Sequence, residues 1–301
     1  MNVRGPDFSI THPGTDTGTF VFVDNMGRGQ AKLYFPLRDA TSGDWQRPNF
    51  FYELEEYGLG PNRPKINLIR AISEIDLSKR NILPGKADPH PVELLITKIS
   101  DEMLYLRRFD GSQALILIRS LDKESRQYRY VPVSSFHQKT DGTVDYEETR
   151  DQDPLGYLHN PNFNFSEGRE TFFDHYHNEL EWLKASYQTE YPDAVVNLVR
   201  SLTWNPRFKK AQESRQPDLV LSAAPGWNFR IEDIEGADHG HLRADSTRIT
   251  FMMSGPDLRK GVVESPHHLI ELAPTLLYLL NYGIKTDFDA EPIREIENEA
   301  A

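Results

Sequence analysis

The order of the elements expected between residues 217 and 283 limits the fold of this chain more than any other feature of the sequence. The run PDLVLSAAPGW predicts an apolar strand, begun by Pro217-Asp218 and ended by Pro225-Gly226. The polar loop GADHGHLRAD follows, then a second strand in TRITFMMSG and a short helix in ELAPTLLYLLNYG. Strand, polar loop, strand and helix in this order are typical of an α/β sheet, where ligand sites gather at strand ends.

Strand-like and helix-like runs also alternate upstream, which predicts an α/β protein with a central mixed or parallel sheet flanked by helices. TGTFVFVDN and QAKLYFPL are expected to pair as a hairpin. The run ALILI is apolar throughout and favours a strand buried on both faces, whereas VELLITKIS fits either a helix or a strand. The most helical stretch begins at Arg169 and is broken at Tyr191-Pro192, and a second helix is expected over 193–201.

Composition excludes several classes of partner and site. The 46 acidic residues outnumber the 34 basic ones, and the formal charge of −12 argues against binding to duplex nucleic acid or an anionic membrane surface. Because the chain has no cysteine, any metal must be held by His and carboxylate ligands. Neither a signal peptide nor a run of about 20 apolar residues is present, so as written we expect a cytoplasmic location.

Two polar, turn-rich stretches, 80–91 and 137–154, are expected to be surface loops and candidate boundaries. We expect a single domain over 1–301. A finer division gives an N-terminal subdomain at 1–136, a linker at 137–154, a C-terminal subdomain at 155–285 and a flexible tail at 286–301.

The polar loop of the last third holds the candidate metal ligands Asp238, His239 and His241. In an extended loop the side chains of His239 and His241 share a face, and Asp238 is either a further ligand or the partner that orients His239. A solvated loop is the alternative interpretation. His175 and His177 diverge by about 200° on a helix, so a shared metal is not expected and we predict surface or interface positions for them. His267-His268 are expected at a solvated surface position where the last helix begins.

Four groups of residues in this region resemble the alkaline phosphatase superfamily, specifically the C-terminal part of its type I phosphodiesterase/nucleotide pyrophosphatase-like branch. They are DLVLSA (218–223), His239-Gly240, Ser254-Gly255-Pro256 and APTLL (273–277). A weaker similarity extends to YRYVPV, DPLGY, YPDA and VDNMGRGQAKLYF upstream. The resemblance implies an alkaline phosphatase-like sandwich portion, in which Thr247–Ser254 is a sheet strand and the helix near 271–282 packs its leucine stripe on the sheet.

The resemblance also implies a two-metal phosphohydrolase with a Thr or Ser nucleophile and Zn²⁺, or another divalent cation such as Mn²⁺. His239 matches the late metal-ligating histidine of the family and is expected to point into an open cleft. The nucleophile and the other ligands of the family have no counterpart in this chain. The resemblance therefore implies that the N-terminal half of the family fold, which carries the nucleophile, is missing from this chain. One histidine is too few to hold two metal ions.

Three functions follow from these observations. The first is the C-terminal portion of a metal-dependent phosphodiesterase or phosphatase, inactive alone and acting on a phosphoester substrate when paired with an upstream half. The second is a degenerate, non-catalytic binding or interaction domain, and the third is a sulfatase-like hydrolase fragment. In each case an upstream half or a homo-oligomer is expected to cover the exposed sheet edge.

Overall fold

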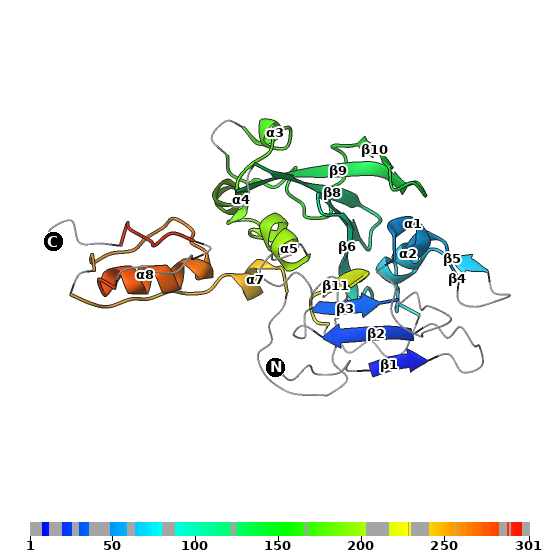
Figure 1. Ribbon diagram of the computed structural model, residues 1–301, viewed down its shortest axis with the longest axis horizontal. Coiled ribbons are helices and arrows are strands. Elements are labelled where there is room, and N and C mark those ends of the chain that lie inside the picture. The colour runs from blue at the N-terminus through cyan, green and yellow to red at the C-terminus, as the bar shows by residue number, and fades with distance from the viewer. Residues whose placement is uncertain are drawn as a thin grey trace.

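Nine antiparallel strands form one sheet in the computed structural model (Figure 1). The structure describes residues 8–11, 20–25, 30–35, 49–58, 64–79, 88–121, 125–165, 168–202, 217–227, 229, 241–256, 258–282, 288 and 290–296. Within these residues the strand order is β1-β2-β3-β11-β6-β7-β8-β9-β10. The strands are Phe8–Thr11 (β1), Phe20–Asn25 (β2), Gln30–Tyr34 (β3), Val92–Ser100 (β6), Met103–Arg108 (β7), Gln113–Ser120 (β8), Arg126–Gln138 (β9), Val144–Glu148 (β10) and Leu219–Ala223 (β11). Tyr57–Gly58 (β4) and Lys65–Ile66 (β5) form a separate short ribbon.

Helices cover both faces of the sheet (Figure 1). On one face lie α1 (Phe51–Glu55) and α2 (Leu68–Ser73), and on the other lie α3 (Arg169–Phe172), α4 (Glu179–Ser186) and α5 (Ala194–Leu202). The C-terminal part contributes α7 (Ala244–Thr247), the 3₁₀ turn η3 (Leu269–Glu271) and α8 (Leu272–Leu279). Among the described helices, none is long and apolar enough to cross a bilayer.

Alternating side chains of the central strands fill two separate cores. In β6, Leu94 and Ile96 belong to the core under α3–α5, whereas Leu95 belongs to the core under α1 and α2. Trp182 of α4 is fully buried and donates its indole N–H to the Tyr128 carbonyl at 3.0 Å, which ties the helix layer to β9. The fold is therefore a three-layer α/β/α arrangement, and its class agrees with the sequence prediction.

The prediction of a mixed or parallel sheet is wrong, because every neighbouring pair of the described strands is antiparallel. Continuous apolar runs such as ALILI usually mark parallel strands, since an antiparallel sheet commonly leaves one face in water. Here helices cover both faces of an antiparallel sheet, so its central strands are apolar on both sides. A continuous apolar run indicates burial on two faces, but it does not indicate whether neighbouring strands are parallel or antiparallel.

Several local predictions are confirmed. The expected hairpin is β2 paired with β3, ALILI lies in β8, and PDLVLSA contains β11. VELLITKIS, for which a helix was also open, is β6. The long helical stretch is divided into α3 and α4, because Asn178 caps a new helix by accepting from the Glu181 N–H at 2.9 Å. The expected loop 137–154 instead contains the end of β9 and all of β10, joined by a turn at Gly142 with φ of +86°.

The C-terminal part departs most from the prediction. No strand is assigned to Thr247–Ser254, and the side chains of Ile249 and Met252 are 63% and 86% exposed. Helix α8 lies beyond α5, away from the strands, so the expected packing of its leucine stripe on the sheet is wrong (Figure 1). Leu276 and Leu280 are 43% and 67% exposed, while the other side of α8 is covered by Ile293, whose N–H donates to Thr275 Oγ1 at 2.9 Å. We call residues 248–282 the C-terminal arm.

A buried carboxylate at the start of β11 joins three segments of the body. Asp218 accepts the backbone N–H groups of Phe35 and Asn49, each at 2.6 Å, and Asn49 donates its side-chain amide to the Phe35 carbonyl. The Asp218 carbonyl also accepts from the Thr97 hydroxyl of β6 at 2.6 Å. Burial raises the pKa of Asp218 to about 6, although the two backbone donors favour its charged form.

We expect Asp218→Ala to lower the free energy of unfolding by about 2–4 kcal/mol, because two buried backbone N–H groups lose their acceptor. The folded pKa of about 6 exceeds the unfolded value of 3.8, so the carboxyl contributes most stability below pH 4. That contribution falls as the pH rises through 6. Urea unfolding at pH 4.5 and 7.5 measures both effects, with the exposed Asp245→Ala as control. A loss no larger than that of the control would contradict this role.

Candidate functional site

The structure places only one of the three predicted metal ligands. Asp238 and His239 lie outside the described residues, so the cleft expected at His239 is untested. His241 is partly buried, and its Nδ1 atom is shielded from solvent and has no hydrogen-bond partner among the described residues. Within the described part of the chain, no group of three or more His, Asp and Glu side chains could hold a metal ion.

The segment that follows His241 is anchored firmly to the body. Leu242 inserts into the core under α3–α5, and the Arg243 guanidinium donates through Nη1 to Glu93 Oε1 at 2.9 Å. Through Nη2, Arg243 also pairs with Glu190. Arg248 then donates to the carbonyl of Thr189 at 3.0 Å. These contacts fix the point at which the candidate loop ends and the C-terminal arm begins.

Glu93 reaches Arg243 because of an irregularity in β6. Ser222 pairs with Leu94 and Ala223 with Val92, so Glu93 is the extra residue of a β-bulge. Bulges re-aim side chains and are frequent near functional sites. The Glu93 side chain is 2% exposed, and a second guanidinium, that of Arg108, approaches it at 3.8 Å. The bulge thus brings a buried carboxylate to the base of the loop.

The carboxylates in this cluster stabilise the charged form of Arg243. Burial opposes the charge of Arg243, but Glu93 and Glu190 outweigh it and raise the pKa of the guanidinium. Burial and the nearby Glu93 carboxylate both raise the pKa of the Tyr191 hydroxyl, over whose ring Arg243 lies at 5.8 Å. On the other side of the loop, the Trp227 indole donates to the Asp88 carbonyl at 2.6 Å. Both flanks of 228–240 are therefore tied to the segment around the start of β6.

A second polar cluster lies where the C-terminal arm returns to the body, and sequence reasoning missed it. Asp193 is 4% exposed, has a φ of +55°, and neither carboxylate oxygen accepts a hydrogen bond among the described residues. His268, expected at the surface, places Nδ1 3.4 Å from Asp193 Oδ2. Burial, with a smaller contribution from the charge of Glu179, raises the pKa of Asp193 well above its usual value.

A third cluster lies within the arm. His267 Nδ1 is 2.6 Å from Glu271 Oε2, and its Nε2 contacts Glu295. Ser265 Oγ lies 3.4 Å from His267 Nε2 and also contacts Glu295. The Glu295 carboxylate thus occupies the position between hydroxyl and imidazole, and it joins 290–296 to the arm.

His175 and His177, for which the sequence predicts surface or interface positions, differ from each other in burial. His175 is exposed, as expected, but His177 is buried, because its ring stacks on Phe172 with centroids 3.7 Å apart. His177 Nε2 lies 2.9 Å from the Phe172 carbonyl. This histidine is part of the core, and neither residue joins the candidate loop.

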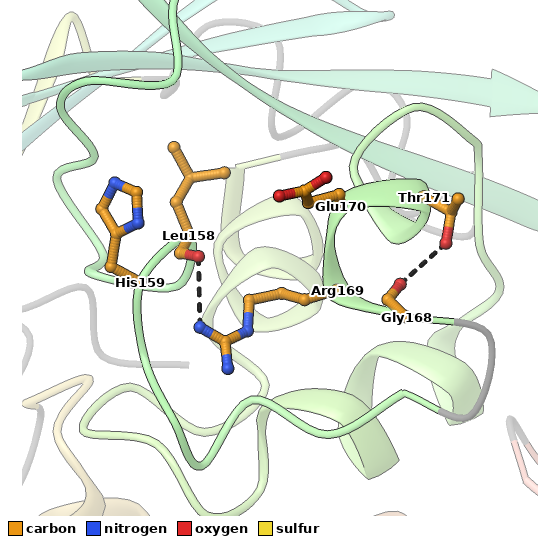
Figure 2. Close-up of a pocket in the computed structure, with 6 residues that line it drawn as sticks. All are labelled: Leu158, His159, Gly168, Arg169, Glu170 and Thr171. Atoms are coloured by element: carbon orange, nitrogen blue, oxygen red, sulfur yellow. Dashed lines mark hydrogen bonds between the residues drawn. The ribbon is translucent and has the colours of Figure 1, made fainter.

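An open cavity of about 510 Å³ lies beside α3 (Figure 2). Figure 2 shows Arg169 donating to the Leu158 carbonyl, at 3.3 Å, with Glu170 and His159 at the rim. Thr171 Oγ1 donates to the Gly168 carbonyl at 2.8 Å. The cavity joins one cationic and one anionic side chain and contains none of the predicted ligands, so it offers no selective site for a phosphoester.

Comparison with family models, curated proteins and solved structures finds no match to this chain. The similarity to the alkaline phosphatase superfamily therefore depends on the sequence motifs alone.

We expect Glu93→Ala to destabilise the protein by about 3 kcal/mol, because it removes the buried carboxylate that pairs with the partly buried guanidinium groups of Arg243 and Arg108. The matched control is Glu56→Ala, which removes the exposed ion pair with Lys65 and should cost less than about 1 kcal/mol. Equilibrium unfolding in urea gives both values. Equal effects of the two substitutions would show that the bulge cluster does not anchor residues 241–248.

Proposed function

We propose that this chain supplies the C-terminal portion of a metal-dependent phosphohydrolase site and is inactive without a further polypeptide segment that carries the nucleophile. The observation that carries the proposal is the exposed apolar run Ile249–Ser254. Its sequence resembles a sheet strand of the alkaline phosphatase superfamily, yet it pairs with none of the described strands.

The backbone of this run has the properties of a strand without a sheet. The Arg248 N–H donates to the Ala244 carbonyl. In the described part of the chain, the backbone groups of residues 249–254 neither donate nor accept a backbone hydrogen bond. Ile249, Phe251 and Met252 are all exposed, and adjacent residues of an extended chain point to opposite faces. A run that is apolar on both faces is suited to the interior of a covered sheet.

Helix α8 has the same requirement. It carries no charged residue, and Leu276 and Leu280 leave an apolar stripe in water. Contiguous exposed apolar surface marks sites of association. Because the run 249–254 and α8 belong to the same arm, one polypeptide surface could cover both, and a segment bearing the nucleophile is the partner that the sequence motifs favour.

The proposed chemistry is metal-assisted hydrolysis of a phosphoester. Two divalent cations would hold the attacking and leaving oxygens and neutralise the charge that develops on phosphorus. From this chain, His239 would supply an imidazole ligand, with Asp238 and His241 beside it, and Zn²⁺ accepts such nitrogen and oxygen ligands. The partner segment would supply the remaining ligands. The cluster of Glu93 and Arg243 would hold the loop at its base.

A non-catalytic interaction domain is the second candidate. The exposed arm favours it directly, because docking through 249–254 and α8 needs neither a metal nor a nucleophile. The two candidates differ in the role of the loop, which binds metal only in the first. A sulfatase-like activity would use the same incomplete loop, and no described residue favours it over phosphoester hydrolysis.

Calorimetric titration with Zn²⁺ tests the role of the loop. We expect weak binding to the chain that is abolished in His239→Ala and reduced in Asp238→Ala and His241→Ala. The exposed His175→Ala, outside the loop, is the matched control and should bind as the unaltered chain does. Tight stoichiometric binding that survives all three loop substitutions would locate the metal elsewhere and contradict the proposal.

Hydrolysis of aryl phosphomonoesters and phosphodiesters with Zn²⁺ or Mn²⁺ tests whether the site is incomplete. The purified chain alone should give no turnover above the metal-only background, since the nucleophile is supplied by the partner segment. Metal-dependent turnover that is lost in His239→Ala would refute this and would place a nucleophile within these 301 residues.

A further inference from the structure

We propose that Asp193 and His268 form a proton-dependent latch, which holds the C-terminal arm on the body when the pair carries one proton and releases it when the pair carries none. This inference goes beyond the proposed function, because it concerns the attachment of the arm in the chain alone. It requires neither metal binding nor a partner. Its consequence for the proposed function is that protonation of the pair would control whether the arm is held on the body or released toward a partner.

The pair lies where the arm returns to the body. His268 precedes the 3₁₀ turn η3 in the arm, and Asp193 precedes helix α5 in the body. Their side chains are 16% and 5% exposed, and Nδ1 and Oδ2 are 3.4 Å apart. The arm is also attached at its base by Arg248, so the pair is a second contact between the described residues of the arm and the body.

Few other groups compensate the charge of the pair. In the described part of the chain, neither Asp193 oxygen accepts a hydrogen bond, and His268 Nε2 is buried without a partner. A buried ionised group without hydrogen bonds is costly, so the free energy of this contact depends on where the protons are. With one proton between them, the two side chains form either an ion pair or a neutral pair, and both satisfy the contact.

The surrounding charges come from both sides of the contact. In the body, Glu179 accepts from Arg200 Nε at 3.1 Å and from the Tyr128 hydroxyl at 2.7 Å. The groups that act on Asp193 or His268 are Glu179 and Arg200 from α4 and α5, Tyr157 beneath them, and His267 and Glu271 from the arm. Arg200 repels a charged His268, whereas Glu179 repels a charged Asp193.

These surroundings give the sign of the pH dependence. In the released arm the ordinary pKa values are 3.8 for Asp193 and 6.5 for His268, so the released pair carries one proton between these values and none above them. In the attached arm, burial and then Glu179 raise the pKa of Asp193, while burial and then Arg200 lower the pKa of His268, so the attached pair keeps its one proton on Asp193. Release at higher pH therefore loses this proton, and attachment weakens as the pH rises from about 6.5 through the raised pKa of Asp193.

Electron–electron distance measurements on the intact chain test the latch. Because the sequence has no cysteine, Lys184→Cys on α4 and Val262→Cys on the arm place spin labels at two exposed positions only. We expect one narrow distance distribution at pH 5–6 and a second, longer component at high pH. Each pKa unit by which attachment shifts the titration of the pair corresponds to a tenfold change in the attachment equilibrium.

Three variants separate the latch from a general effect of pH. Asp193→Asn should remove the alkaline transition, and His268→Gln should move its onset to lower pH, because the released arm then has no imidazole to hold the proton. Asn is favoured at the positive φ of residue 193, so the former variant should keep the fold. The control His90→Gln breaks a more exposed His–Asp pair in the body, where Nδ1 lies 2.9 Å from Asp88 Oδ1, and should leave the transition unchanged. Constant distances in the unaltered arm between pH 5 and 9, or a transition that persists unchanged in both His268→Gln and Asp193→Asn, would overturn the proposal.

Discussion

Burial of the central strands on both faces is the constraint on which the rest of the structure depends. Strands β6 to β9 pair in antiparallel register, and each supplies side chains to two cores. Helices α1 and α2 must cover one face and α3–α5 the other, because an uncovered face would expose rows of leucine, isoleucine and tyrosine. The helices of this three-layer body bury the apolar faces of its sheet, whereas apolar side chains of the C-terminal arm stay exposed.

The sequence predicts the body well where a local pattern decides the structure. Apolar runs bounded by turn residues identify β8 and β11, and the break at Tyr191-Pro192 falls just before α5. Strand direction was mispredicted, because a run such as ALILI is apolar for the same reason in a parallel sheet and in a covered antiparallel one. The run ITFMMSG also has a strand pattern. It pairs with none of the described strands, because pairing depends on a neighbouring strand, which no local pattern provides.

The polar sites were harder to predict. The prediction of Asp238 and His239 depends on the family resemblance and on the closeness of histidine and aspartate in the sequence, and both residues lie outside the described part of the chain. Glu93 and Asp193 act through partners distant in sequence, Arg243 and His268 respectively, which spacing does not reveal. A signal for Glu93 was available, since a carboxylate at the start of the apolar run VELLI is seldom buried unless it is paired. No comparable local signal marks Asp193.

The central claim is that a self-sufficient body carries an apolar arm whose strand-like run has no partner among the residues that the structure describes. Amide hydrogen exchange of the isolated monomer, resolved by residue, tests this most directly. The account predicts slow exchange throughout β6 to β9 and exchange of residues 249–254 at the rate of an unstructured peptide. Protection of 249–254 equal to that of β7 in the monomer would show that the run is already paired within the chain, and would contradict the account.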